Sequence, residues 1–130
     1  MRTVMVFGTF DGLHPGHIDF FKQARQHGDR IVAVVALDET VKKVKQKSPR
    51  QSEQERLAAV QQSGYVDEAR LGYRGDRYRI IREVAPDVIC LGYDQVHFVD
   101  ELPRFFPNTD IVTLKPFHTE IYKSSKLAEE

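Results

Sequence analysis

Residues 3–17 read Thr-Val-Met-Val-Phe-Gly-Thr-Phe-Asp-Gly-Leu-His-Pro-Gly-His, and they join two elements of different periodicity. The almost entirely apolar run 3–7 predicts a buried strand. The apolar positions from 16 to 28 recur at helical spacing, which predicts a helix. A strand that passes through a glycine-rich loop into a helix is typical of a parallel β-α-β unit, and ligands bind such sheets at the carboxyl ends of their strands.

The rest of the chain repeats this alternation. Further strands are expected at residues 31–37, 68–71, 88–91 and 110–114. Further helices are expected from the Ser52/Glu55 capping box, at 78–84, at 96–106 and from Ser124 onward. The alternation predicts an α/β protein with a parallel sheet and right-handed crossovers. The 130 residues are expected to form a single domain, 1–130.

The composition narrows the function classes. Lysine plus arginine and aspartate plus glutamate each number 19, so the net charge is zero, which argues weakly against a general nucleic-acid binder. Cys90 is the only cysteine, which excludes an intramolecular disulfide, and its apolar surroundings predict a buried, inert thiol. The sequence shows neither a signal-peptide pattern nor an apolar run long enough to span a bilayer. A cytoplasmic location without membrane association is therefore expected.

The loop between the first strand and the first helix carries groups suited to phosphate. Gly8, Gly12 and Gly16 allow the backbone to approach a ligand closely, and the helix start adds free amides. His14 and His17 lie three residues apart at this helix start. Two other interpretations stay open: structural histidines, or a zinc ion whose only visible third ligand would be Asp11. The spacing fits neither a dinucleotide-binding nor a P-loop motif.

Segments 8–11 and 14–17, Gly-Thr-Phe-Asp and His-Pro-Gly-His, resemble the H-x-G-H signature of the cytidylyltransferase-like nucleotidyltransferases. The resemblance implies a Rossmann-like three-layer fold with a five-stranded parallel sheet. It also implies transfer of a nucleotide from a nucleoside triphosphate to a phosphate-bearing acceptor, with release of pyrophosphate. His14 and His17 would then bind the triphosphate and stabilise charge at the α-phosphate. The resemblance further suggests a nucleotide site that includes Gly8, Thr9 and Phe10, with Asp11 beside the acceptor.

A second candidate segment, residues 38–43, follows the expected second strand at the same edge of the sheet. By resemblance, Lys42 is a catalytic lysine that contacts phosphate, and Asp38 and Lys43 contact the acceptor. Five basic side chains between residues 42 and 50 also fit a solvated charged loop, and that interpretation stays open.

The helix start Ser-Glu-Gln-Glu-Arg at residues 52–56 resembles the corresponding segment of the family, whose arginine faces the substrate cleft. This implies that Arg56 contacts the acceptor. An ion pair between Arg56 and Glu53, one turn earlier on the helix, is the alternative and carries equal weight.

Residues 92–95, Gly-Tyr-Asp-Gln, follow the expected fourth strand. Gly92 would let a base approach the backbone, and Asp94 could receive a ribose hydroxyl or help to hold Mg²⁺. A simple turn is the alternative. The stretches 86–95 and 38–43 are similar to archaeal FAD synthetases, which favours ATP and FMN as substrates.

Lys-Ser-Ser-Lys at residues 123–126 resembles the second phosphate motif of the family. The resemblance implies that Ser124 and Ser125 bind the triphosphate at the start of the last helix. His118 stands where glycerol-3-phosphate cytidylyltransferases have an arginine, and the glycine of their motif is missing. This departure weakens the cytidylyltransferase interpretation, and whether His118 or Lys123 replaces the arginine stays open.

The expected activity is therefore nucleotidyl transfer, with ATP and FMN as the favoured substrates. A CTP-dependent enzyme acting on glycerol 3-phosphate is the second candidate, and a nucleotide-binding sensor without turnover is a candidate of another class. The resemblance implies Mg²⁺ held mainly by phosphates, with Asp94 as the one possible protein ligand. It also implies a homodimer.

Overall fold

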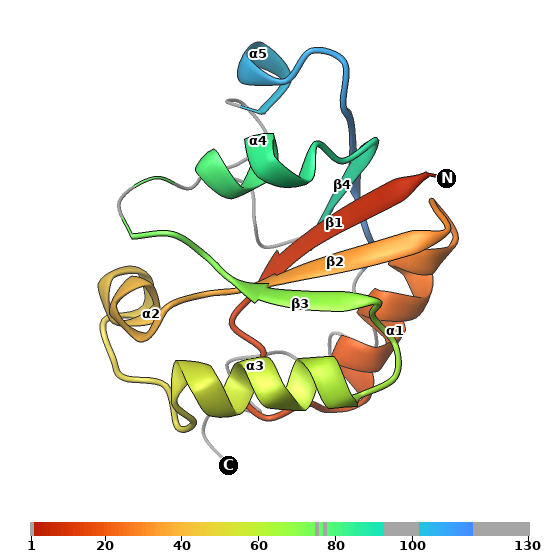
Figure 1. The fold of residues 1–130 in the computed structure, drawn as a ribbon. Helices are drawn as coiled ribbons and strands as arrows, with labels where there is room; N and C mark the ends of the chain where they lie inside the picture. Colours follow the sequence, from red (N-terminus) through yellow and green to blue (C-terminus); the bar gives the residue numbers. More distant parts are fainter. Residues whose placement is uncertain (1, 75, 77, 93–101, 116–130) are drawn as a thin grey trace.

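The computed structural model describes residues 2–74, 76, 78–92 and 102–115. In this part of the chain, five strands form one sheet, which runs through the middle of the molecule (Figure 1). The strands are β1 (Thr3–Gly8), β2 (Arg30–Val35), β3 (Glu68–Leu71), β4 (Val88–Leu91) and β5 (Asp110–Thr113). Their order is β3-β2-β1-β4-β5, and every neighbouring pair is parallel.

Helices cover both faces of the sheet (Figure 1). They are α1 (Pro15–Arg25), α2 (Asp38–Lys45), α3 (Glu53–Gln62), α4 (Arg79–Val84) and α5 (Leu102–Phe105). One apolar cluster lies under α1 and α3 and includes Phe21, Ala24 and Val60. A second cluster lies under α4 and α5 and includes Ile80, Ile81 and Leu102. The predicted Rossmann-like three-layer fold with a five-stranded parallel sheet is confirmed.

The central strand β1 feeds both clusters, because successive side chains of a strand point to opposite faces. Val4 and Val6 join the cluster under α1 and α3, whereas Met5 and Phe7 join the cluster under α4 and α5. β2 is buried from Ile31 to Val35, as an inner strand of a parallel sheet should be. The apolar runs of the sequence thus mark the inner strands correctly.

The strand order of the sheet reverses between β1 and β4. From β1 the chain builds outward through β2 and β3, and it then returns to place β4 and β5 on the other side of β1. Such a switch point opens a crevice at the carboxyl ends of its two strands. The glycine-rich loop after β1 and Gly92 after β4 both lie at these ends, where the strand-helix alternation predicts a ligand.

The predicted elements differ from the structure mainly at their ends. β1 continues to Gly8, β2 spans 30–35 instead of 31–37, and β5 ends one residue earlier, at Thr113. α1 ends at Arg25 rather than continuing to Gly28, and α4 begins at Arg79. Of the helix expected over 96–106, the described part is α5, and the helix expected from Ser124 lies outside the described residues.

Helix α2 was not predicted, and it takes in residues 42–45 of the basic segment 42–50, whose open alternative was a solvated charged loop. It contains few apolar residues, so its helical periodicity is weak in the sequence. Asp38 and Glu39 in its first turn complement the positive end of the helix dipole, and Val41 is buried. The helix ends at Gln46, which adopts a left-handed conformation with φ of 59°.

Among the described residues, no helix is long and apolar enough to cross a bilayer.

Candidate active site

Two imidazoles cap the amino end of α1. His14 is the N-cap residue, and its Nδ1 accepts a hydrogen bond from the Gly16 amide at 3.0 Å. The His17 Nδ1 accepts from the His14 amide at 3.4 Å, so the two histidines form a reciprocal capping box of the kind usually made by Ser and Glu. Because Nδ1 is an acceptor in both rings, each neutral imidazole carries its proton on Nε2. Each ring therefore supplies an Nε2–H donor at a helix amino end.

The histidine pair rests on Phe10. The His14 and His17 ring centroids lie 3.9 Å apart, and the Phe10 ring contacts His17 edge-on at 5.5 Å between centroids. Phe10 is almost fully buried and has a φ of 54°, which is a strained conformation for this residue type. A Cβ on Gly8 would lie only 2.7 Å from Cζ of Phe10, so the packed ring requires glycine there. The structure thus gives the Phe10 side chain a supporting role beside His17, and its expected place in the nucleotide site stays a prediction.

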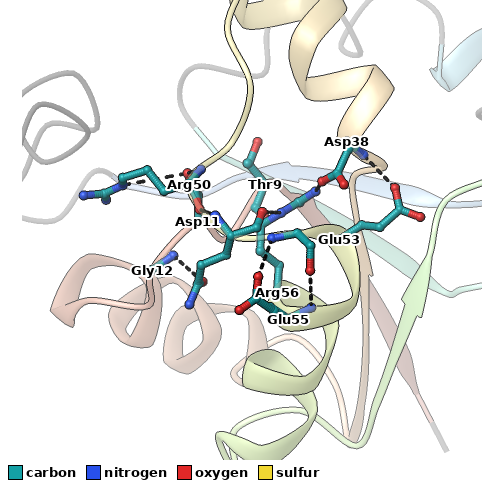
Figure 2. A network of polar contacts seen from close by, with 10 residues as sticks. Thr9, Asp11, Gly12, Asp38, Arg50, Glu53, Glu55 and Arg56 are labelled. Atoms are coloured by element: carbon teal, nitrogen blue, oxygen red, sulfur yellow. Dashed lines mark hydrogen bonds and ion pairs between the residues drawn. The ribbon is translucent and has the colours of Figure 1, made fainter.

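Asp11 ties the glycine-rich loop to the segment that precedes α3 (Figure 2). Its two carboxylate oxygens accept hydrogen bonds from the Arg50 amide at 2.8 Å and the Gln51 amide at 2.9 Å. The Gly12 amide donates in return to Oε1 of Gln51 at 3.0 Å. Both Asp11 oxygens therefore hold these two segments together, and the expected contact of Asp11 with the acceptor stays a prediction. Within the described segments, no three His, Cys, Asp or Glu side chains are arranged to hold a metal ion, so the zinc interpretation finds no support there.

Arg56 is completely buried and binds three separate segments (Figure 2). Its Nη1 donates to the Thr9 carbonyl at 2.8 Å, its Nη2 donates to Oδ1 of Asp38 at 2.7 Å, and its Nε donates to the Gln51 carbonyl at 3.1 Å. The expected contact with the acceptor is therefore wrong for this side chain, because it lies inside the protein. The alternative partner, Glu53, instead accepts a hydrogen bond from the Asp38 amide at 2.8 Å.

The sequence did contain a signal for this arrangement. Ser52 and Glu55 form the predicted capping box, which fixes the register of α3. Arg56 then lies one turn before the buried Val60, so it belongs to the inward stripe of the helix. This register points to a buried Arg56, whereas the family resemblance predicts a contact with the acceptor and the helical spacing an ion pair with Glu53.

A hollow of about 280 Å³ lies beside this network, at the carboxyl end of β2. It is lined by Asp38, Glu39, Lys42, Ser48, Pro49, Gln51 and Ser52. The hydrogen bond from Arg56 holds the pKa of Asp38 below its usual value, so its half-exposed carboxylate stays charged at neutral pH. The hollow thus combines a carboxylate held in place, a lysine and several polar groups. This lining is suited to a polar acceptor substrate.

Lys42 and Lys43 take different places on α2. Lys42 lines the hollow, whereas Lys43 is not among its lining residues. The pKa of Glu39 is lowered first by its hydrogen bonds from Arg74 and also by the positive charge of Lys43. The structure therefore brings Asp38 and Lys42 together and leaves Lys43 exposed beside Glu39.

The remaining candidates divide between described and undescribed positions. Gly92 follows β4 and is half-buried at the switch point. Asp94, Ser124 and Ser125 lie outside the described residues, as do His118 and Lys123. Cys90 is fully buried in β4, and this burial raises the pKa of its thiol to about 12, which confirms the predicted inert cysteine.

The geometry now accounts for the motif that suggested the family. A family model described as Cytidylyltransferase-like matches residues 5–129. The chain belongs to this family. The match covers the capped histidine pair, the buried arginine and the hollow together, and it confirms the resemblance drawn from the H-x-G-H motif.

Individual relatives agree with this assignment. An FAD synthase of Aciduliprofundum boonei is 47% identical over 95 residues, which cover 73% of this chain and 63% of that protein. An FAD synthase of Methanohalophilus mahii is 36% identical over 98% of this chain and 92% of that protein. Among solved structures, a protein of Thermoplasma volcanium described as a lipopolysaccharide core biosynthesis protein has 37% identity and a TM-score of 0.82, covering 90% of this chain and 98% of that chain. The match thus spans less than two thirds of the first relative and nearly the whole of the second.

Proposed function

We propose that this chain is an ATP:FMN adenylyltransferase, which makes FAD and releases pyrophosphate. The observation that carries the proposal is the FAD synthase similarity over 98% of the chain, combined with the histidine-capped helix at the switch point. The match to the Methanohalophilus mahii protein takes in nearly the whole chain, including the described core.

The reaction needs positioning and charge neutralisation more than a base. A phosphate oxygen of FMN attacks the α-phosphorus of ATP, which forms a new P–O–P bond. The bond between the α-phosphorus and its bridging oxygen breaks, and pyrophosphate leaves with the electron pair. The FMN phosphate is already anionic at neutral pH, so the step requires no strong general base. Hydrogen-bond donors that face the developing charge supply the catalysis.

The triphosphate site is assigned to the amino end of α1. The first amides of α1 already donate to His14, so the helix dipole and the Nε2–H groups of His14 and His17 are the features proposed to attract the phosphates. The backbone of Gly8, Thr9 and Gly92 lies at the same edge of the sheet and is suited to a nucleoside. Ser124 and Ser125 are proposed to bind the β- and γ-phosphates, and Asp94 is proposed to bind the ribose.

The acceptor site is assigned to the hollow beside α2. Lys42 is placed to neutralise the FMN phosphate, and the Asp38 carboxylate can accept hydrogen bonds from hydroxyl or N–H groups of the acceptor. Lys43 would add positive charge at the rim. In this arrangement the two substrates meet between α1 and α2, with Gln51 between them.

Mg²⁺ is proposed to enter as the Mg²⁺ complex of ATP. Both oxygens of Asp11 already accept backbone amides, and one oxygen of Asp38 already accepts from Arg56. Mg²⁺ keeps much of its coordination from phosphates and water in such sites, so it needs few protein ligands.

We further propose that the protein is a homodimer, which the family resemblance supports. We also propose a location in the cytoplasm, which the single, buried cysteine supports.

A substrate matrix tests the activity. Pyrophosphate release is measured with ATP or CTP, each combined with FMN, glycerol 3-phosphate or phosphopantetheine. The proposal predicts release only with ATP plus FMN, and loss of that release in His17→Ala. His27→Ala, which changes a histidine at the end of α1 far from the site, should retain activity. Release with CTP plus glycerol 3-phosphate would favour the cytidylyltransferase, and nucleotide binding without turnover on any pair would favour a sensor.

A further inference from the structure

Arg56 has an unusual environment for a charged side chain. It is the only buried polar or charged residue in the described part of the chain. Its Nε, Nη1 and Nη2 atoms each donate a hydrogen bond to another part of the protein. Two of its acceptors are neutral carbonyls, and its one charged partner, Asp38, is half-exposed. Burial of a charge is costly, and an apolar side chain of similar volume often stabilises such a position equally well. The guanidinium therefore supplies specific geometry rather than simple packing.

The geometry concerns the loop that carries the histidines. Nη1 of Arg56 donates to the carbonyl of Thr9, the residue before Phe10. Phe10 has a left-handed backbone conformation, and its ring contacts His17. The Gln51 carbonyl is held by Nε, and the side chain of the same Gln51 accepts from the Gly12 amide. Arg56 thus holds this loop directly at Thr9 and indirectly, through Gln51, at Gly12, on the two sides of Asp11.

The same guanidinium also fixes the acceptor side. Its Nη2 binds Asp38, the first residue of α2, and Lys42 lies one turn further along that helix. Both Asp38 and Lys42 line the hollow. One planar side chain thus connects the histidine-bearing loop to the helix that bears the acceptor lysine (Figure 2).

We propose that Arg56 is a positioning residue that sets the alignment of the acceptor phosphate with the α-phosphorus of ATP. This inference rests on the proposed function. Alignment errors near 1 Å lower the rate of such reactions by about 100-fold, whereas each substrate keeps its own binding contacts. Arg56 therefore governs turnover and leaves the affinity for each substrate nearly unchanged. Lysine cannot replace it, because an ammonium group lacks the planar fork that holds three acceptors at once.

The central test is the variant Arg56→Lys, which keeps the charge and loses the fork. The expected result is a fall in kcat of about 100-fold, with KM for ATP and for FMN within about threefold of the original values. The matched control is Arg82→Lys, which changes an exposed arginine of α4 that pairs with Asp76 on the opposite face of the sheet. A purely structural role would lower the active fraction and leave the kcat of the folded enzyme unchanged, and that result would overturn the proposal.

Chemical rescue supplies a second readout. In Arg56→Ala, free guanidinium at low, non-denaturing concentration should occupy the vacated site and restore part of kcat, whereas methylammonium should not. Guanidinium should not restore His17→Ala. If Arg56→Ala does not fold, the comparison is made in Arg56→Lys with the same additives. Equal effects of guanidinium and methylammonium would contradict the positioning role.

NMR separates this inference from the proposed activity. Imidazole nitrogen chemical shifts report the capping hydrogen bonds of His14 and His17 without any substrate. Arg56→Lys should shift both resonances and leave that of His27 unchanged, even if the original chain makes no FAD. Unchanged His14 and His17 shifts would overturn the positioning role, and absence of FAD formation alone would overturn only the proposed function.

Discussion

The main-chain N–H of His14 donates a hydrogen bond to Nδ1 of His17 across 3.4 Å. The Nδ1 of His14 accepts in turn from the Gly16 amide, so one nitrogen of each ring stabilises the helix start. The other nitrogen, Nε2, then carries the ring proton and is the atom that we propose donates to a phosphate. Helix capping and the proposed contact with phosphate therefore use different nitrogen atoms of the same rings, and substitutions can separate the two roles.

The variants His17→Asn and His17→Gln test this division. The asparagine amide oxygen takes a position near that of Nδ1, so His17→Asn should keep the cap and change the unfolding free energy by less than about 1 kcal/mol. It should lower kcat by about 100-fold or more, because the Nε2 donor is lost. His17→Gln should retain more activity, since its amide nitrogen reaches further. Turnover measured with ATP and FMN, together with thermal unfolding, checks both expectations, and normal turnover in His17→Asn would refute them.

Gly8→Ala should destabilise the fold through Phe10. The new Cβ would lie 2.7 Å from Cζ of Phe10, and the buried ring has little room to move. Overpacking of this kind lowers the unfolding free energy by about 1–3 kcal/mol. Gly72→Ala is the control, because its Cβ would meet its nearest neighbour at an ordinary 3.7 Å. Denaturant unfolding measures both variants, and equal stabilities would show that Phe10 does not impose glycine at position 8.

The acid sensitivity of the fold should depend in part on Asp67. A hydrogen bond from the Ile31 amide, supported by the charges of Arg25 and Arg30, lowers the pKa of Asp67 below 3.8. A carboxyl group whose pKa is lower in the folded state stabilises the protein fully when the pH is above its pKa in the unfolded state. That stabilisation is lost as the pH falls through its pKa in the folded state. The unfolding free energy of Asp67→Asn should therefore fall less steeply than that of the original chain as the pH drops below about 5. Parallel curves for the variant and the original chain would contradict this.

The Cys90 thiol should be unreactive in the folded protein. It is fully buried, and its pKa of about 12 leaves almost no thiolate at neutral pH. A thiol reagent such as Ellman's reagent should modify Cys90 only after denaturation. Rapid modification under native conditions, without loss of the fold, would show that β4 opens readily.

The sequence allowed the fold to be predicted because its inner strands are continuous apolar runs. Residues 31–35 and 88–91 are buried on both faces, so any other placement would expose them. Helix α2 escaped prediction because its charged residues outnumber its apolar ones, and its stability depends on the buried Val41 and on acidic residues at its start. Local pattern is a weak guide for such a helix.

The roles of single site residues were harder to predict. The acceptors of Arg56 come from residues 9, 38 and 51, which only the folded chain brings together. Asp11 similarly uses its carboxylate on amides 39 and 40 positions further along the chain. The short spacing of His14 and His17 was enough to bring them together at the start of α1, and their role toward phosphate stays a prediction.

The central claim is that the adenylyl group of ATP, including its α-phosphate, is transferred to the phosphate of FMN. The most direct measurement follows ATP that carries a radioactive label on either the α- or the γ-phosphate, incubated with FMN and the full chain. The account predicts that the α-label appears in FAD and the γ-label appears in pyrophosphate, with both signals lost in His17→Ala. Labelled pyrophosphate without labelled FAD, or no transfer from ATP while CTP labels glycerol 3-phosphate, would contradict the account.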